Sequence, residues 1–340
     1  MKRLPVIKYI LFGISTLLVL VLCICVGSVN IPLSDTVVAI WNTVFGLPIP
    51  EETVQSIIVF VRLPRVLCVA LVGASLSLCG AAMQGLLRNP LADGSTLGVS
   101  SGAALGAVIA IAFGIVLPGI PFAGTMVMGM LFAFLSLTII LSLAHKLDYS
   151  LSTNTIILIG VVFSMFVNSI LSFIITFSHE KLKTITFWTM GSLAGSNYHS
   201  VLLLLGSLLV CGGILLAHAR ELNAFALGED NARHIGVDVK KVKLTVLITI
   251  SALIGICVSI GGAIGFVGLV MPHMTRRIVG PDHKRLLPAA MFLGALFLML
   301  ADLVSRTLLS PLELPVGVVT SFIGAAVFVY IFYVTRKVRK

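Results

Sequence analysis

The sequence predicts an all-α membrane protein, a polytopic bundle of about ten transmembrane helices with its N and C termini on the cytoplasmic side. Hydrophobic residues make up 58% of the chain and charged residues only 11%, against about 25% charged residues in soluble domains. The apolar residues also fall into runs of spanning length, and the basic residues gather between particular runs. We expect residues 1–340 to form a single transmembrane domain with one long polar loop near 218–243.

Ten apolar runs account for the predicted helices, because each is long enough, or nearly so, to cross roughly 30 Å of hydrocarbon. The second run is longer than one crossing needs, which suggests a tilted or extended helix. The eighth is short and contains Pro272, so its assignment as a span depends on the charge distribution. The runs lie at 9–29, 57–87, 95–114, 121–144, 153–177, 200–217, 244–263, 265–280, 286–304 and 315–334.

Basic residues support the count of ten. With a cytoplasmic N terminus and ten spans, eighteen of the 23 Lys and Arg residues face the cytoplasm, as the positive-inside rule requires. Without the eighth span, the basic loop 276–285 and the basic C-terminal tail would lie on opposite sides. The net charge of +10 therefore indicates membrane orientation and contact with the anionic headgroups of the lipid bilayer, and nucleic acid is not expected as a partner.

Asp302 is the only acidic residue that lies clearly within a predicted span. Arg306 follows one helical turn later, and this spacing predicts a local ion pair. Ion-coupled transporters usually hold ionisable groups at mid-depth, whereas these spans offer mainly small, hydroxyl, methionine and phenylalanine side chains. Such a wall suits a bulky neutral or shielded solute, and the energy for uphill transport should come from elsewhere. An ion-coupled secondary transporter is the alternative.

Glycines four residues apart predict close helix packing, and they form two sets: Gly98, Gly102 and Gly106, then Gly261 and Gly265. Residues 98–102 also match the G-x-S-x-G pattern of serine hydrolases around Ser100. Neither a preceding strand nor a histidine placed as a base accompanies the pattern, so an intramembrane serine enzyme is a minor alternative. The histidines show no ligand spacing and the cysteines are typical of core positions, so we expect neither a metal site nor a catalytic residue.

The polar segment 218–243 cannot lie in hydrocarbon, where each charge near the centre of a helix costs about 2.5 to 3.5 kcal/mol. Its short apolar stretches are separated by Gly228 and Gly236, which predicts one or two short helices joined by turns. Such a segment outside the membrane is suited to docking on another protein.

Several longer stretches resemble one family in their order along the chain. They include FWTMGSLAG at 187–195 and LGEDNARHIGV at 227–237, with further matches at 62–106, 265–289 and 301–328. Together they cover most of the chain from residue 60 onward. The sequence resembles the permease subunits of FecCD-type (type II) ABC importers for iron-siderophores, haem and cobalamin.

The resemblance implies a subunit of the bacterial cytoplasmic membrane that imports a bulky metal chelate, with a ferric siderophore as the favoured cargo. It implies pairing with a second permease subunit, identical or homologous, with two cytoplasmic ATPase subunits and with an extracytoplasmic substrate-binding protein. The chain has no G-x-x-x-x-G-K-[ST] loop, so it should bind no nucleotide itself. ATP and Mg are expected on the ATPase subunits, and no cofactor on this chain.

The resemblance also assigns candidate site residues. In the family the polar loop supplies a helix that couples to the ATPase, and a short helix with acidic residues in its first turn and a glycine at its end forms a rigid unit. The matching residues are Leu227, Gly228, Glu229, Asp230, Ala232, Arg233 and Gly236.

Two further groups follow from the resemblance. Arg62, Arg65 and Arg306 match positions that receive glutamates of the binding protein, since guanidinium groups bind carboxylates bidentately; the alternative is that they anchor the helices, with Arg306 held by Asp302. A cytoplasmic gate is expected in the loops after the second and fourth spans, formed by Asn89, Pro90, Leu91, Ser152, Thr153 and Asn154.

Overall fold

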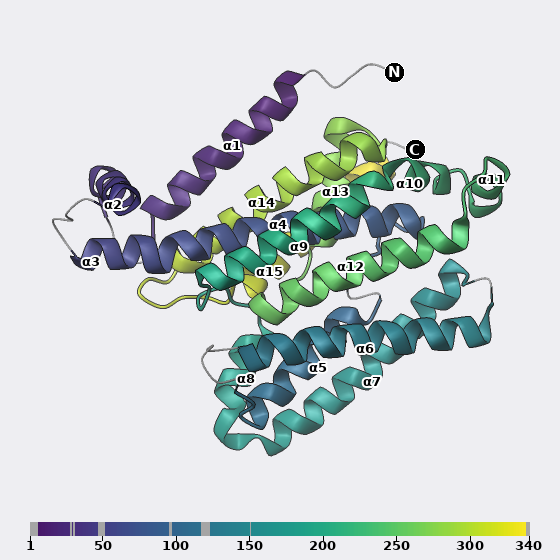
Figure 1. Cartoon of the computed structure of the whole chain (residues 1–340), viewed down its shortest axis with the longest axis horizontal. Coiled ribbons are helices and arrows are strands. Elements are labelled where there is room, and N and C mark those ends of the chain that lie inside the picture. The colour runs from purple at the N-terminus through teal and green to yellow at the C-terminus, as the bar shows by residue number, and fades with distance from the viewer. Residues whose placement is uncertain are drawn as a thin grey trace.

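The computed structural model describes residues 6–27, 29, 31–46, 52–94, 97–116, 123–149 and 151–337. Within these ranges the regular elements are all helices, and most of the long ones run along the longest dimension of the molecule (Figure 1). All ten predicted apolar runs coincide with a helix. The elements are α1 Val6–Cys25, α2 Leu33–Phe45, α3 Glu52–Gln55, a π-helical segment Ser56–Arg62, α4 Leu63–Leu86, α5 Val99–Ala112, α6 Ala123–Leu147, α7 Thr153–Phe177, a 3-10 turn His179–Lys181, α8 Leu182–Thr189, α9 Tyr198–Ala217, α10 Ala219–Phe225, α11 Glu229–His234, α12 Val239–Gly261, α13 Val267–Val279, α14 His283–Thr307 and α15 Val316–Lys337.

Seven of the helices in the described ranges are long and apolar enough to cross a membrane. The number of spans is therefore not fixed at ten by length alone. Helix α5 has 14 residues, because Gly98 directly before it adopts a left-handed conformation with φ +72° and so the helix cannot extend further toward the N terminus. Helix α13 has 13 residues, because it starts after Phe266 in a left-handed conformation and ends at Gly280 with φ +86°. Pro272 lies inside it without ending it.

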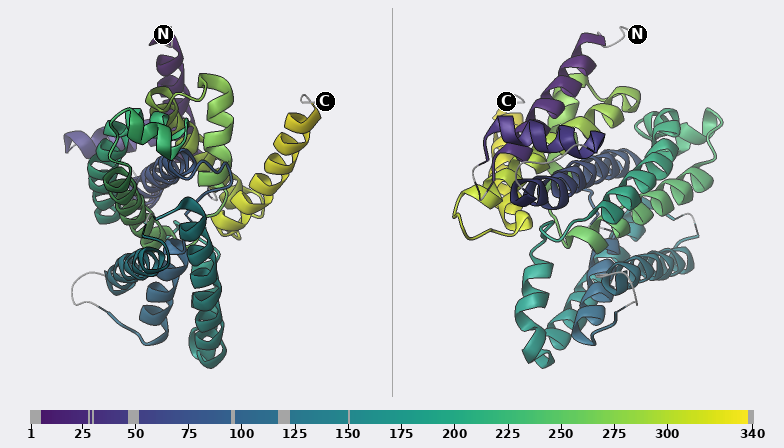
Figure 2. Two further views of the ribbon diagram at one scale, coloured as in Figure 1. Left: turned by 90° about the vertical axis from the view of Figure 1, so that its right-hand side faces the viewer. Right: turned by 60° about the vertical axis from the view of Figure 1, so that its left-hand side comes forward.

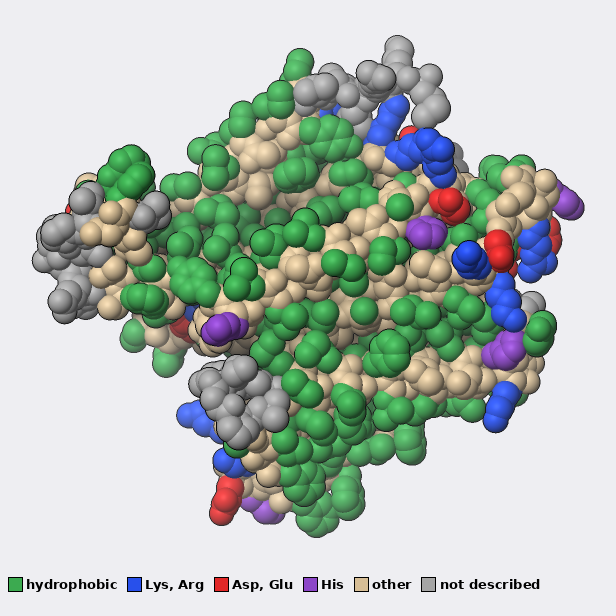
Figure 3. Space-filling model, in the orientation of Figure 1, with side chains coloured by type: hydrophobic (Ala, Val, Ile, Leu, Met, Phe, Trp, Pro, Cys, Tyr) green, Lys and Arg blue, Asp and Glu red, His purple; other side chains and the backbone are tan. Residues whose placement is uncertain are grey.

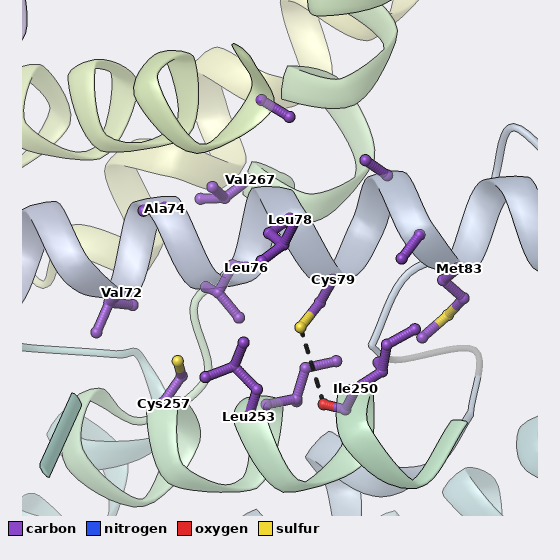
Figure 4. Packing of buried hydrophobic residues seen from close by; sticks show 14 of the residues in the cluster. Val72, Ala74, Leu76, Leu78, Cys79, Met83, Ile250, Leu253, Cys257 and Val267 are labelled. Carbon is purple, nitrogen blue, oxygen red and sulfur yellow. Dashed lines mark hydrogen bonds between the residues drawn. The ribbon is translucent and has the colours of Figure 1, made fainter. Parts of the chain in front are cut away.

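Helix α4 lies at the centre of the bundle. In the span Ser56–Leu86, which includes α4, 78% of the most apolar stretch is buried inside the molecule, against 11% in the span of α1. It packs against α9, α12, α13 and α14. Figure 4 shows Leu76 and Cys79 of α4 pointing toward Leu253 and Ile250 of α12, and the Cys79 thiol lies 3.8 Å from the Ile250 carbonyl oxygen.

The helices form two groups, which Figure 2 shows most clearly. Helices α5 to α8 lie together on one side, and α4, α9, α13 and α14 lie on the other. Helix α12 contacts both groups, since it packs against α4 and α9 and also against α5 and α6. It therefore connects the two groups of helices.

Glycines mark the closest helix crossings. A Cβ added at Gly80 of α4 would lie 1.9 Å from the Gly268 carbonyl oxygen of α13, and one at Gly73 would lie 2.3 Å from the Gly294 carbonyl oxygen of α14. Real Cβ atoms do not approach oxygen so closely, so these crossings require glycine. The sequence reasoning overlooked them because each pairs glycines that are far apart in the chain.

The glycines that the sequence analysis assigned to helix packing differ in how closely their neighbours approach them. At Gly102 and Gly106 the backbone of α6 comes close, with the Met128 carbonyl oxygen 2.1 Å from a Cβ placed on Gly106. A Cβ added at Gly98 would meet atoms of α6 and α7, and one added at Gly261 would lie 3.0 Å from the Leu193 side chain. Gly265 has more room, since the nearest atom would be 3.7 Å away.

The lateral surface is apolar, as a lipid-facing surface requires. Hydrophobic side chains cover the sides of the molecule in Figure 3, and most charged side chains gather at its two ends. Helix α7 exposes Leu158, Met165, Phe166 and Phe173 along one face, each more than 60% accessible. In Figure 1 the start of α1 and the end of α15 lie toward the end of the molecule that carries α10 and α11, which we call the α10–α11 end.

Candidate functional site

The polar segment folds as two short helices, as predicted. In α10, Ala219, Leu222, Ala224 and Phe225 are buried, so this helix is fixed to the bundle by apolar contacts. In α11 only Ala232 is buried. Helix α11 is bounded by the two glycines, Gly228 with φ +108° before it and Gly236 with φ +90° after it. Both angles disfavour residues with a side chain, so these glycines set where α11 begins and ends.

Polar contacts attach α10 to the start of α14. The Asn223 side-chain amide donates to Asp282 Oδ1 at 2.7 Å, and Asn223 Oδ1 accepts from the His283 backbone N–H at 2.8 Å. Burial raises the pKa of the Asp282 carboxyl, but hydrogen bonds from Asn223 and from the Lys284 backbone outweigh this effect and leave its pKa below the usual value. Asp282 is therefore ionised while it caps α14, where negative charge stabilises a helix N terminus.

An ion pair attaches α11 to the start of α12. Lys243 Nζ lies 2.6 Å from Glu229 Oε1, and the lysine side chain is 1% exposed while that of Glu229 is 26% exposed. The same ammonium donates to the Leu151 carbonyl oxygen at 3.0 Å. The Thr153 hydroxyl donates to Glu229 Oε1 at 3.3 Å. We call Glu229, Lys243, Leu151 and Thr153 the lysine node.

The outer surface of α11 is exposed. Leu227 and Ile235, on either side of the helix, are 64% and 63% accessible. Asp230 and Arg233 form an exposed ion pair with 3.6 Å between Oδ1 and Nη1. Two large apolar side chains beside exposed charges at the tip of a membrane bundle form a surface suited to a protein partner.

The two predicted gate segments have local turn structures. Asn89 Oδ1 accepts from the Leu91 backbone N–H at 2.9 Å, which closes an Asx turn around Pro90. Ser152 caps α7, since its hydroxyl oxygen accepts from the Thr155 N–H at 3.4 Å. Thr153 belongs to the lysine node and Asn154 is exposed.

At the opposite end lies a group of charges that we call the arginine cluster. Asp302 Oδ1 lies 2.9 Å from Arg65 Nη2, and Asp302 Oδ2 lies 2.9 Å from Arg306 Nε. The predicted Asp302–Arg306 ion pair is thus confirmed, and Asp302 forms a second ion pair with Arg65. Arg65 further binds Glu313 at 2.7 Å, and the Glu313 side chain is 33% exposed.

Arg62 and Arg306 also cap the C terminus of α1. Arg62 Nη1 donates to the carbonyl oxygens of Ile24 at 3.0 Å and Cys25 at 2.9 Å, and its Nη2 donates to that of Val29. Arg306 Nη2 donates to the Cys23 carbonyl oxygen at 3.0 Å. Cations stabilise the C-terminal end of a helix.

The three arginines therefore have helix-anchoring contacts and are only 3% to 5% exposed. In this arrangement their guanidinium groups are enclosed, and their contacts are those of the alternative in which the arginines anchor the helices. The reason is that Asp302, Glu313 and the α1 carbonyls, which are distant in the sequence, converge on them.

Ser100 does not lie in a hydrolase-like site. It stands in the first turn of α5 and lines a cavity of about 120 Å³ with Asp93, Phe266 and neighbouring residues, none of them a histidine. The described residue before α5 is a turn and not a strand. Among the described residues, no group of three His, Cys, Asp or Glu side chains is placed to bind a metal ion.

In the described residues, a multi-span helical bundle with a helical polar loop at one end defines an integral membrane protein. Residues 15–334 match the FecCD transport family, and the chain belongs to that family. It is 43% identical over 324 residues to an uncharacterised ABC transporter permease protein, YvrB, of Bacillus subtilis, covering 94% of this chain and 92% of the relative.

Other relatives carry cargo names. The cobalamin import system permease protein of Halobacterium salinarum is 41% identical, over 84% of this chain and 75% of its own. Permease proteins for molybdate, hemin and iron(3+)-hydroxamate, from Haemophilus influenzae, Yersinia pestis and Bacillus subtilis, are 36%, 37% and 35% identical. A solved structure of a metal-chelate-type ABC transporter in an inward-facing conformation has a TM-score of 0.83 and 33% identity, covering 95% of this chain and 97% of its own.

These comparisons establish the chain as a transport subunit and not an enzyme, located in the bacterial cytoplasmic membrane as a multi-span protein. The serine-enzyme alternative is therefore excluded. Sequence reasoning missed Lys243, Asn223, Asp282 and Glu313 as contact residues. Of these four residues, only Lys243 could have been noticed in the sequence, since it lies directly before the apolar run 244–263.

Proposed function

We propose that this chain is the permease subunit of an ATP-driven importer that takes up a bulky metal chelate, with a ferric siderophore as the specific cargo. The relatives named for hydroxamate iron, hemin and cobalamin support a chelate. The few charges within the spans support a shielded solute, since a bare ion needs polar partners in the membrane. The molybdate relative makes an oxyanion the competing cargo.

One observation carries the ATP-driven part of the proposal: α11 is a short, exposed helix held at one end of the bundle by a buried ion pair. We propose that Leu227, Gly228, Glu229, Asp230, Ala232, Arg233 and Gly236 form the contact to the ATPase, and that the α10–α11 end faces the cytoplasm. A movement of the ATPase would then be transmitted to the bundle through the Glu229–Lys243 ion pair, which is costly to separate because the lysine is buried.

The partners follow from this role. Two ATPase subunits would bind ATP and Mg and contact α11 from the cytoplasm. A second permease subunit, identical or homologous, would complete the pathway. The apolar faces that α7 and α15 expose would contact either this subunit or lipid. An extracytoplasmic binding protein would deliver the chelate at the end that carries the arginine cluster.

Docking of that binding protein is proposed at Arg62, Arg65 and Arg306. Because all three are buried, we infer that an incoming carboxylate would reach Arg65 by replacing Glu313, the one acidic group of the arginine cluster with substantial exposure. Arg62 and Arg306 would then support the docking surface through their contacts with α1.

The gate is proposed at the α10–α11 end, in the turn of Asn89, Pro90 and Leu91 and in the segment of Ser152, Thr153 and Asn154. Asn89, Ser152, Thr153 and Asn154 carry amide or hydroxyl groups, and such side chains can close a passage without binding cargo tightly. The hydrogen bond between Thr153 and Glu229 places one gate segment in contact with α11.

The test is reconstitution of the permease with its ATPase and binding protein in proteoliposomes. Uptake of a ferric hydroxamate, hemin, cyanocobalamin and molybdate would be measured side by side, and ATP-dependent uptake of the ferric hydroxamate is expected. Uptake of molybdate alone would contradict the chelate proposal.

A variant sharpens the test of coupling. Gly228→Trp with Glu229→Lys should leave ATP hydrolysis in place and abolish uptake, because the start of α11 cannot keep its backbone angle or its ion pair. Lys284→Met, an exposed lysine at the same end, is the control and should transport normally. Normal uptake by the double variant in an assembled complex would count against coupling through α11.

A further inference from the structure

The lysine node joins two segments that are 76 residues apart in the chain. Glu229 lies in the first turn of α11, whereas Leu151 and Thr153 lie at the start of α7. Lys243, one turn into α12, contacts both sides, with Glu229 Oε1 at 2.6 Å and the Leu151 carbonyl oxygen at 3.0 Å. The node is thus a physical link between the proposed ATPase contact and one of the proposed gate segments.

The burial of Lys243 makes this link hard to break. Its side chain is 1% exposed, and a buried ammonium without partners is strongly unfavourable. An ammonium has three donors and no acceptor, so a carboxylate and a carbonyl oxygen together suit it well. If α11 moved away alone, the charge would lose Glu229 while still shielded from water.

The segment at the start of α7 is itself held together closely. Asp148 Oδ2 accepts from the Ser152 N–H at 3.1 Å and from the Thr155 hydroxyl at 3.4 Å, and Ser152 caps the helix. A pull on Leu151 or Thr153 therefore acts on the first turn of α7 as a whole. Along one face, α7 exposes large apolar side chains, so none of the helices in the described part of the chain restrains it there.

We propose that Lys243 is the positioning residue that makes α11 and the start of α7 move as one unit. The proposal rests on the proposed function, because an ATPase must move α11 for the link to matter. Lys243 contacts neither cargo nor nucleotide; it acts by holding Glu229 and Leu151 at once.

The test measures a distance between α11 and α7 by pulsed electron paramagnetic resonance. Spin labels are placed at His234, an exposed residue of α11 outside the proposed ATPase contact, and at Leu158, which is 63% exposed, after the six native cysteines are replaced. The permease–ATPase complex in nanodiscs is compared without nucleotide and after trapping with Mg-ATP and vanadate. In the wild type the mean distance should stay the same in both states.

In Lys243→Met the same trapping should shift or broaden the distance, because α11 moves and α7 does not follow. Lys284→Met removes an equal charge at the same end and should behave as the wild type. Thr153→Val, which removes one hydroxyl, should give a smaller shift of the distance in the same direction. If Lys243→Met does not fold, the Thr153→Val result tests the link between α11 and α7.

Three outcomes overturn the inference. A wild-type distance that changes on trapping shows that the two segments do not move as one unit. A constant distance in both Lys243→Met and Thr153→Val, with trapped ATPase present, shows that the node is not needed and leaves the proposed function intact. A wild type that forms no trapped complex with an ATPase overturns the proposed function and this inference together.

Discussion

The two ends of the molecule hold their charges in different ways. In the arginine cluster, three buried cations share Asp302, Glu313 and the last carbonyl groups of α1, and so they fasten α1, α4 and α14 to one another. At the α10–α11 end, one buried cation holds a six-residue helix whose outer surface is exposed. The first arrangement stabilises several long helices at once, and the second attaches one small movable helix.

This difference indicates what each end can do. A cluster in which each charge has several partners loses much if one is removed, so it forms a rigid surface. A helix joined by one ion pair, one hydroxyl contact and one buried alanine can transmit a movement without disturbing the bundle.

Asp302→Ala should be the most damaging change, because it leaves Arg65 and Arg306 buried without their shared carboxylate. Breaking a buried pair costs about 3 to 5 kcal/mol, which should appear as a large fall in the melting temperature of the detergent-solubilised protein. Glu313→Gln, at a partly exposed partner, is the matched control. If both variants melt alike, the arginine cluster is not the rigid unit described.

Gly80→Ala should come next, since the added Cβ would lie 1.9 Å from the Gly268 carbonyl oxygen. Overpacking of this kind costs about 1 to 3 kcal/mol, measured again as a lower melting temperature. Gly206→Ala, an exposed position on α9 with no atom within 4 Å of the new Cβ, should be neutral or slightly stabilising. Equal effects at both positions would argue against the close α4–α13 crossing.

Asn223→Ala tests the attachment of α10. The variant leaves Asp282 and the His283 N–H without their amide partner, at a cost of about 1 to 3 kcal/mol. Hydrogen exchange should accelerate at the start of α14 and in α10, while α11 keeps its wild-type rates because the lysine node is untouched. Faster exchange in α11 alone would reverse the roles assigned to the two attachments.

Glu313→Gln should have the smallest effect, on docking of the binding protein. It frees one edge of the Arg65 guanidinium for an incoming carboxylate, so affinity should increase by about 0.2 to 1 kcal/mol and should fall more steeply with added salt. Surface plasmon resonance at two salt concentrations measures both. Charge reversal at Arg65 or Arg306 should weaken docking, but it also removes a partner of Asp302, so unchanged affinity in Glu313→Gln is the clearer contradiction.

Much of the fold could be predicted from the sequence, because long apolar runs and basic loops directly reflect the energy of insertion into lipid. All ten runs became helices, and the loop at 218–243 became two short ones. The shortness of the eighth run was visible in the sequence, but the exact start of α13 was not, because it depends on Phe266 in a left-handed conformation. Helices α2 and α8 were missed because each has a short apolar stretch mixed with polar residues.

The candidate sites were predictable in position but not in contacts. The sequence located Asp302 and Arg306 as a pair because they are one turn apart, and the structure confirms the pair. It could not reveal that Arg65, 237 residues away, shares the carboxylate, nor that Lys243 contacts the Leu151 carbonyl oxygen. Such contacts depend on how helices cross, and neither composition nor spacing encodes the crossing.

The most direct measurement is cargo uptake into proteoliposomes that hold this chain with its ATPase and binding protein, with ATP supply and membrane potential varied independently. Uptake should stop when vanadate blocks ATP hydrolysis while ion gradients are kept, and it should continue when ionophores collapse the gradients and ATP remains. Uptake that follows the gradients and does not depend on ATP would contradict an ATP-driven permease and favour an ion-coupled transporter.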